Sequence, residues 1–129
     1  MNAEKEMLIQ AATEAMHRAY APYSGFKVGA ALLTRDGEQF TGCNIENHSY
    51  GLTICAERTA IFKAVSAGIR EFQMMVIIAD NPEPVIPCGA CLQVMAEFNT
   101  KLLLICMNTD QLTTEYMLDS LLPLPFHLK

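Results

Sequence analysis

The chain is best approached through two short segments, Cys55-Ala56-Glu57 and Pro87-Cys88-Gly89-Ala90-Cys91. Each segment opens a stretch in which apolar residues recur with helical spacing, which predicts helices over about Cys55 to Ala67 and over Gly89 to Phe98. Potential metal ligands therefore stand at the start of two successive helices. In an open α/β sheet such helix starts lie outside the carboxyl ends of the strands, where ligands bind.

The N-terminal part of the chain predicts a helix followed by a hairpin. Apolar residues from Leu8 to Ala19 form one stripe at three- and four-residue spacing, and Asn2 suits the N-cap of this helix. Strands are predicted at residues 26–34 and about 39–45, joined by a turn that contains Asp36-Gly37. The polar stretch from 44 to 53 is too long for a tight turn, so we expect it to contribute to a site.

The second half of the chain alternates strands with helices. The continuous apolar run Met74–Ala79 predicts a strand that is covered on both faces, and Lys101–Met107 predicts another buried strand. Residues 80–87, with three prolines, predict a loop, and Leu112–Ser120 fits either a short strand or a helix. This order of elements predicts an α/β fold with a central sheet flanked by helices and with parallel crossovers in its second half.

Length and composition predict one compact domain over residues 1–129, because 14.3 kDa leaves no room for a second core. Apolar residues make up 51% and charged residues 18% of the chain, against roughly 25% charged in a typical soluble domain. Part of the surface is therefore expected to be buried against other subunits.

Charge and hydropathy restrict the partners. The formal net charge is −5, and the nine Lys and Arg residues are scattered singly, without the basic cluster that nucleic-acid binding normally uses. The longest apolar runs have six residues, far fewer than the roughly 18 that span a bilayer. We therefore expect neither nucleic-acid nor membrane binding, and a small uncharged substrate fits better.

The five cysteines suit a reducing compartment. The N-terminus is polar and acidic, unlike a secretory signal, which predicts a cytoplasmic protein. An odd number of thiols in a reducing cytosol is poor material for disulfides. The cysteines are therefore either inert core thiols or metal ligands.

Cys55, Cys88 and Cys91 are suited to bind one zinc ion. Cys88 and Cys91, three residues apart on the first turn of a helix, point to the same side, and Cys55 can supply a third sulfur. A helix N-terminus favours the thiolate form that zinc requires. Three protein ligands leave the fourth tetrahedral position open, as in catalytic zinc sites. One alternative is a dithiol redox pair. Another is a structural zinc with Cys43 or Cys106 as the fourth ligand, although these two cysteines are more simply explained as packing thiols.

Glu57 and Arg58 complete a chemical constellation around these sulfurs. Glu57 lies two residues after Cys55, where a carboxylate can take a proton from zinc-bound water and deliver it to a substrate. Zinc with three thiolates carries a net charge of −1, which a guanidinium donating to sulfur would offset. Taken singly, a helix-start glutamate and a solvated arginine would be common features; taken together with the metal ligands, they indicate catalysis.

The order Cys-x-Glu followed by Pro-Cys-x-x-Cys is the pattern of zinc nucleobase deaminases. The chain resembles the small, homotetrameric, three-cysteine class of cytidine deaminases over nearly its full length. This family has a three-layer α/β/α fold with a central mixed sheet of about five strands. Besides the metal motifs, the resemblance rests on Ala21-Pro22-Tyr23-Ser24-x-Phe26-x-Val28-Gly29-Ala30-Ala31-Leu32, on Gly42-x-Asn44-Ile45-Glu46-Asn47-x-Ser49-Tyr50-Gly51-Leu52-Thr53 and on Leu121-Leu122-Pro123-x-x-Phe126.

The resemblance implies roles for six substrate-contacting residues. Asn44 and Glu46 match the pair that hydrogen-bonds the ribose hydroxyls, so a nucleoside is expected rather than a free base. Phe26 matches a residue that packs on the base or sugar, and the Ala56 backbone contacts the base. Without the resemblance, Asn44 could be a turn residue of the loop, Glu46 could be a charged surface residue, and Phe26 could be an aromatic residue of the core. The positions that reach a neighbouring subunit's site in the family correspond to Tyr50 and Phe126.

The resemblance implies an enzyme that deaminates cytidine and deoxycytidine to uridine and deoxyuridine plus ammonia, a hydrolase acting on carbon–nitrogen bonds of cyclic amidines in pyrimidine salvage. One Zn²⁺ per chain gives a hydroxide that attacks C4, and Glu57 shuttles the protons. The expected assembly is a homotetramer with shared active sites. The alternatives are a deaminase of a modified pyrimidine nucleoside such as blasticidin S, and a non-catalytic, zinc-stabilised binding module.

Two positions depart from the family pattern. Leu92 stands where the family usually has an arginine before the glutamine that corresponds to Gln93, which puts one contact around the metal or between subunits in doubt. His48 stands where a small residue is usual, and an exposed loop histidine is the simplest interpretation. Both substitutions could support a modified-nucleoside substrate.

Overall fold

The computed structural model describes residues 3–128. Its elements follow one another as α1 (Ala3–His17), β1 (Val28–Thr34), β2 (Gln39–Cys43), the short 3-10 helix η1 (Tyr50–Leu52), α2 (Ala56–Ser66), β3 (Phe72–Ala79), α3 (Gly89–Phe98), β4 (Leu103–Asn108), β5 (Thr113–Met117) and α4 (Leu118–Leu121).

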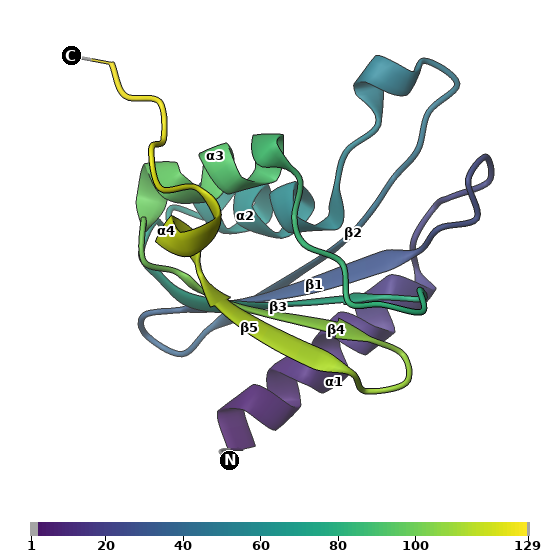
Figure 1. The fold of residues 1–129 in the computed structure, drawn as a ribbon, viewed down its shortest axis with the longest axis horizontal. Coiled ribbons are helices and arrows are strands. Elements are labelled where there is room, and N and C mark those ends of the chain that lie inside the picture. Colours follow the sequence, from purple (N-terminus) through teal and green to yellow (C-terminus); the bar gives the residue numbers. More distant parts are fainter. Residues whose placement is uncertain (1–2, 129) are drawn as a thin grey trace.

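The five strands form one mixed sheet in the order β2-β1-β3-β4-β5. β3 and β4 are parallel, and the other neighbouring pairs are antiparallel. Helix α1 lies on one face of the sheet, and α2 and α3 lie on the other (Figure 1). The predicted three-layer arrangement with a five-stranded mixed sheet is confirmed. Among the helices of residues 3–128, none combines the length and the apolar character needed to cross a membrane.

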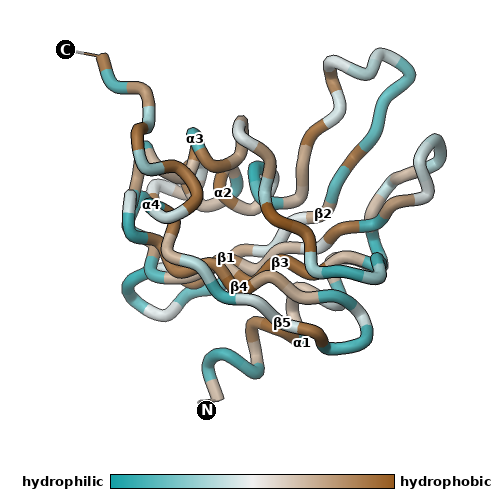
Figure 2. Tube along the Cα trace, in the orientation of Figure 1, coloured by the Kyte–Doolittle hydropathy of each residue, from teal (hydrophilic) through white to brown (hydrophobic). Residues whose placement is uncertain are grey.

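The central strands supply the core on both faces of the sheet. All seven residues of β1 are buried, and its side chains alternate between the two layers. Ala30 and Leu32 belong to the cluster under α2 and α3, whereas Ala31 and Leu33 belong to the cluster under α1. Figure 2 shows the same division, with hydrophobic central strands and more hydrophilic connecting turns. The uninterrupted apolar runs in the sequence are explained by this burial on both sides.

Strand direction brings the starts of α2 and α3 together. Because β2 and β3 are each antiparallel to β1, they run in the same direction, and β4 is parallel to β3. The chain therefore leaves β2 toward α2 and β3 toward α3 at the same end of the sheet. Both helices pack on the same face (Figure 1), so their N-termini are neighbours.

Two glycines allow helices to approach the sheet at backbone distance. A Cβ atom at Gly42 in β2 would lie 2.5 Å from Ala56 O and 2.5 Å from Ala60 N of α2. On the opposite face, a Cβ atom at Gly29 in β1 would lie 2.1 Å from Ala12 O of α1. Gly42 therefore sets the height of the α2 N-terminus above the sheet, and with it the position of Cys55.

Several predicted boundaries differ from the structure. The first strand begins at Val28 rather than at residue 26, and β2 ends at Cys43 rather than near residue 45. At this end of the hairpin the Asn44 side chain, and not a further pair of strand residues, bonds the backbone at Val28 N and Phe26 O. Helix α1 ends at His17, before Ala19. The ambiguous segment Leu112–Ser120 contains both possibilities, since β5 is followed directly by α4. The predicted N-cap, Asn2, lies outside the described residues.

We expect the substitution Gly42→Ala to lower the free energy of unfolding by about 1–3 kcal/mol, because the added methyl group overpacks the contact with α2. Chemical denaturation followed by circular dichroism measures this change. Gly51→Ala is the matched control, since a Cβ atom there meets nothing within 4 Å, and its effect should stay within about 0.5 kcal/mol. Equal stability of Gly42→Ala and the unsubstituted protein would contradict the close packing of α2 on β2.

Candidate active site and metal centre

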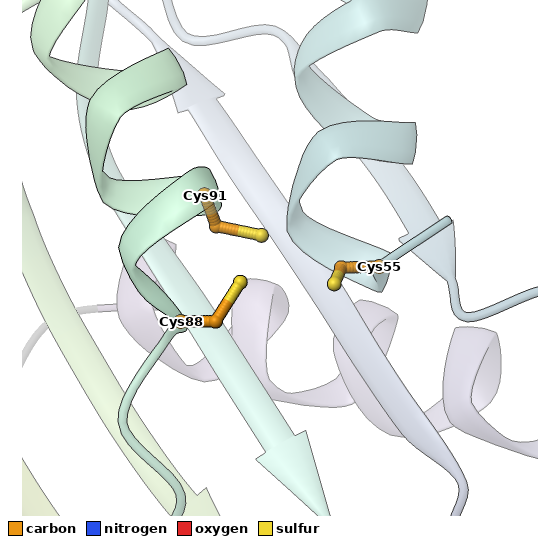
Figure 3. A group of neighbouring side chains, drawn as sticks. All are labelled: Cys55, Cys88 and Cys91. Atoms are coloured by element: carbon orange, nitrogen blue, oxygen red, sulfur yellow. The ribbon is translucent and has the colours of Figure 1, made fainter. Parts of the chain in front are cut away.

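Three sulfur atoms meet where α2 and α3 begin. Cys55 is the N-cap of α2, Cys88 is the N-cap of α3, and Cys91 lies in the first turn of α3. Their Sγ atoms all lie within 4.8 Å of one another, and Figure 3 shows the three side chains pointing toward a common centre. Tetrahedral zinc with Zn–S bonds of about 2.3 Å places its sulfur ligands about 3.8 Å apart. The cluster therefore suits a zinc ion with little adjustment.

The surroundings of the sulfurs favour negative charge. Arg58 Nη2 donates to Cys55 Sγ at 3.3 Å. The pKa of the Cys55 thiol falls to about 5, mainly because Cys91 hydrogen-bonds to its thiolate and further because of Arg58. The same bond with Cys55, together with burial, raises the pKa of Cys91. Of these two bonded sulfurs, Cys55 is thus the one that ionises more readily.

Arg58 has a buried donor beside this cluster. Its Nε atom is buried and has no hydrogen-bond partner within residues 3–128. The hydrogen bond to Cys55 also raises the pKa of the guanidinium, which keeps it charged. A cation with an unused buried donor fits a set of sulfur ligands that become thiolates on binding a metal.

Glu57 is a buried carboxyl group in the first turn of α2. Only 6% of the residue is exposed, and burial raises its pKa to about 7. The negative charge of Cys55 also contributes to this rise, and Arg58 opposes it. A carboxyl group with a pKa near neutrality can both accept and release a proton at physiological pH, which is what a general acid and base requires.

A cavity of about 290 Å³ lies next to the sulfur cluster. Phe26, Asn44, Glu46 and Ala56, all predicted to contact substrate, line this cavity. Its other lining residues are Val28, Thr53, Ile54, Cys55, Glu57, Ile77, Val85, Ile86 and Cys88. The cavity therefore places apolar side chains, two polar recognition groups, the carboxyl group and two of the sulfurs around one space.

Asn44 has a structural role in addition to its place in the cavity wall. Its Oδ1 accepts from Val28 N at 2.9 Å, and its Nδ2 donates to Phe26 O at 2.7 Å. An amide side chain has two donor hydrogens and two acceptor lone pairs. One N–H and one lone pair of Asn44 thus stay available for a ligand, while the other pair fixes the strand start beside Phe26.

Glu46 is held by the turn that precedes β1. Its Oε1 accepts from Tyr23 N at 2.9 Å and from Ser24 N at 3.2 Å, and its Oε2 accepts from the Ser24 hydroxyl. The Ser24 hydroxyl bond is the main cause that lowers the pKa of Glu46. The side chain is therefore an ionised acceptor with about one of its four lone-pair sites unused, suited to a hydroxyl donor.

Tyr50 and Phe126 do not line this cavity in their own chain. Tyr50 lies in η1 and is 79% exposed, and Phe126 is 69% exposed. The loop that contains η1 and the C-terminal segment project on opposite sides of α2 and α3 (Figure 1). Gln93 connects to this tail rather than to the sulfurs: its Nε2 donates to Phe126 O at 3.1 Å, and its Oε1 accepts from Phe126 N at 3.0 Å.

The two departures from the family pattern have different surroundings. Leu92 is buried in the core cluster under α2 and α3, where it packs as an ordinary apolar residue. His48 is exposed, and its ring lies 5.1 Å from the ring of Tyr23, centroid to centroid. Of the two remaining cysteines, Cys106 is fully buried and its pKa is raised to about 12 by burial, whereas Cys43 is only partly buried.

The sequence interpretation missed one wall of the cavity. Val85 and Ile86 lie in the loop between β3 and α3, which was predicted only as a loop because of its prolines. Two adjacent apolar residues directly before the Pro-Cys-x-x-Cys motif are the signal that could have identified this wall.

Residues 2–107 match the family described as the cytidine and deoxycytidylate deaminase zinc-binding region. A protein of Sporosarcina psychrophila named cytidine deaminase is 58% identical over 93 residues, which is 72% of this chain and 68% of that protein. A crystal structure of cytidine deaminase from Burkholderia pseudomallei has a TM-score of 0.92 and 47% identity, and it covers 98% of this chain and 100% of its own.

Similarity to a protein with another substrate is lower. A protein of Bacillus cereus named blasticidin-S deaminase is 31% identical over 128 residues, which is 92% of this chain and 89% of that protein. The relatives of higher identity, at 58% and 47%, are both named cytidine deaminase.

We expect Cys88→Ala to reduce the zinc content from about one ion per chain to nearly none, because two sulfurs hold the ion far less well than three. Metal analysis after dialysis measures the content. Cys88 is exposed, so its removal leaves the core intact. Cys43→Ala is the control and should retain the metal. Full zinc content in Cys88→Ala would contradict the three-sulfur site.

Proposed function

Because the chain belongs to the cytidine and deoxycytidylate deaminase zinc-binding family, we propose that it is a zinc-dependent hydrolase that converts cytidine and deoxycytidine to uridine and deoxyuridine plus ammonia. One observation carries the proposal: the cluster of three sulfurs, which lie within 4.8 Å of one another, borders through Cys55 and Cys88 the same cavity that the buried Glu57 lines. A metal site, a proton-transfer group and a space of substrate size thus coincide.

Cys55, Cys88 and Cys91 are the groups that would hold zinc, and Arg58 stabilises the resulting thiolate charge. A bound zinc ion supplies Lewis acidity, which makes a water molecule a competent nucleophile at neutral pH. The helix N-termini at Cys55 and Cys88 add a favourable field for anionic sulfur.

Glu57 moves the protons. Its carboxylate accepts a proton from the attacking water and delivers it to ring N3, which makes C4 of the base electrophilic. The same side chain then passes the second proton of that water to the amino group, which leaves from C4 as ammonia. The oxygen of water thus becomes O4 of uridine, and the balance is one nucleoside plus water giving one nucleoside plus ammonia.

The polar groups of the wall recognise the sugar. The unused N–H of Asn44 and the unused lone-pair site of Glu46 suit an acceptor and a donor of the ribose hydroxyls. Phe26 packs against the base or the sugar, and the Ala56 backbone faces the base. The ionised Glu46 disfavours a substrate that carries a 5′-phosphate, because like charges repel.

Assembly into a homotetramer with shared active sites is part of the proposal. Several apolar side chains are left exposed in this chain, and two of them are the residues proposed to enter a neighbour's cavity. The most exposed of these side chains are Tyr50 at 79%, Leu52 at 71%, Leu124 at 89%, Phe126 at 69% and Leu128 at 86%. Contact with other subunits would remove this surface from water.

A cytoplasmic place in pyrimidine salvage accords with this chemistry. The five cysteines are free thiols, and three of them are needed in that form as metal ligands. A reducing compartment preserves them. We place the reaction among those that recover free nucleosides, because the proposed substrate is a nucleoside.

We expect Glu57→Gln to lower kcat for cytidine by about a thousandfold or more, because the amide cannot carry the proton. The ultraviolet change on deamination measures the rate, and metal analysis should still find about one zinc per chain. Absence of any deamination by the unsubstituted, zinc-loaded protein would overturn the proposed function. Comparable rates with blasticidin S or cytosine would redirect the substrate, and zinc binding without turnover would favour the binding module.

Shared active sites predict recovery of activity in mixed assemblies. Glu57→Gln and Phe126→Ala subunits, each nearly inactive alone, should regain activity when refolded together, since a cavity with intact Glu57 can receive an intact Phe126 from its neighbour. Glu57→Gln mixed with Cys88→Ala is the matched control and should remain less active. Glu57 and Cys88 line the cavity of the same chain, so every cavity of this mixture lacks either the carboxyl group or the metal ligand. A mixture no more active than the sum of its parents argues against sharing through Phe126.

A further inference from the structure

Asn108 is a buried polar residue that the proposed reaction does not use. It ends β4, none of its surface is exposed, and within residues 3–128 its side chain makes hydrogen bonds only with backbone groups. The Oδ1 atom accepts from Asp110 N at 3.0 Å and from Leu112 N at 2.9 Å, while Nδ2 donates to Pro82 O at 2.8 Å. A buried amide is costly unless it is bonded in this way.

These bonds connect two segments that are distant in the sequence. The bonds of Oδ1 close the turn between β4 and β5, in which Gln111 has a φ of 68°. The bond of Nδ2 reaches the loop between β3 and α3 at Pro82. The start of that loop is also tied down, since Asp80 N donates to Lys27 O at 3.3 Å and Thr109 Oγ1 donates to Asp80 Oδ1 at 3.4 Å.

The loop that Asn108 holds forms a wall of the cavity. Val85 and Ile86 follow Pro82 closely and line the cavity, and Pro87 and Cys88 come next. Pro82, Pro84 and Pro87 restrict φ through this stretch. The position of Pro82 therefore largely determines the positions of Val85 and Ile86. Asn108 itself does not line this cavity.

We propose that Asn108 is a positioning residue for substrate binding, which acts by fixing Val85 and Ile86 through its bond to Pro82 O. This inference rests on the proposed function, because it assumes that the cavity receives the nucleoside. A displaced wall weakens contacts that are made equally in the ground state and the transition state. The expected signature is therefore a higher KM with little change in kcat.

Asn108→Asp tests the proposal, because the substitution keeps the Oδ1 acceptor of both turn bonds and replaces the Nδ2 donor by an oxygen that, in the ionised carboxylate, repels Pro82 O. We expect KM for cytidine to rise about tenfold, kcat to stay within about threefold, and zinc to remain at about one per chain.

Asn99→Asp is the matched control. Asn99 Nδ2 donates to Phe72 O at 2.8 Å, and Oδ1 accepts from Lys101 N at 2.9 Å, at the far end of α3 from the sulfurs. This variant loses the same kind of bond and should keep KM within about twofold. An unchanged KM in Asn108→Asp, or an equal rise in Asn99→Asp, would overturn the proposal.

Pro82→Gly keeps the inference testable if Asn108→Asp does not fold. Pro82 is exposed, so its replacement loosens the loop without disturbing the core. A higher KM with kcat preserved supports the transmission from Pro82 to the wall, and an unchanged KM overturns it. Failure of the proposed function is distinguished from both results, because the unsubstituted protein would then show no deamination at all.

Discussion

The arrangement of this protein depends on two helix N-termini that meet above one end of a sheet. β2, β3 and β4 run in one direction, so α2 and α3 leave the sheet at the same end and on the same face. Cys55 and Cys88 cap these helices, and Cys91 follows within one turn. The distance between the helix starts is set by backbone packing, notably of α2 on β2 at Gly42. Sulfur geometry is therefore a property of the whole three-layer fold rather than of a local loop.

Charge is the second constraint on the site. Three sulfur ligands and a carboxyl group crowd around one point, and Arg58 provides the cation that contacts Cys55 directly. Burial raises the pKa of Glu57 to about 7, whereas the hydrogen bond from Ser24 lowers the pKa of Glu46 and keeps that carboxyl group ionised. Two carboxyl groups of one cavity thus differ in environment, which suits one to proton transfer and the other to hydrogen-bond acceptance.

Much of the fold and the meeting of the cysteines could be predicted from the sequence because they depend on local patterns. Continuous apolar runs identified β3 and β4, and Cys-x-x-Cys at a helix start identified two of the three clustered sulfurs. The double role of Asn44 could not be predicted, since its bonds to Phe26 and Val28 join residues that are close only in the folded chain. The same holds for Gln93, whose partner is the backbone of Phe126. Strand ends such as Cys43 were misplaced because a side chain, not a turn motif, terminates the pairing.

The clamp between Gln93 and the tail has a consequence for how such a protein can diversify. Both bonds of Gln93 run to main-chain atoms of Phe126, so the course of the tail is independent of the side chain carried there. A residue of different size or polarity at position 126 would therefore lie in the same place, because the backbone there keeps both hydrogen bonds to Gln93. A substitution at position 126 therefore changes the side chain that a neighbour would receive and leaves the course of the tail unchanged, whereas a substitution at Gln93 removes the two bonds that hold the tail.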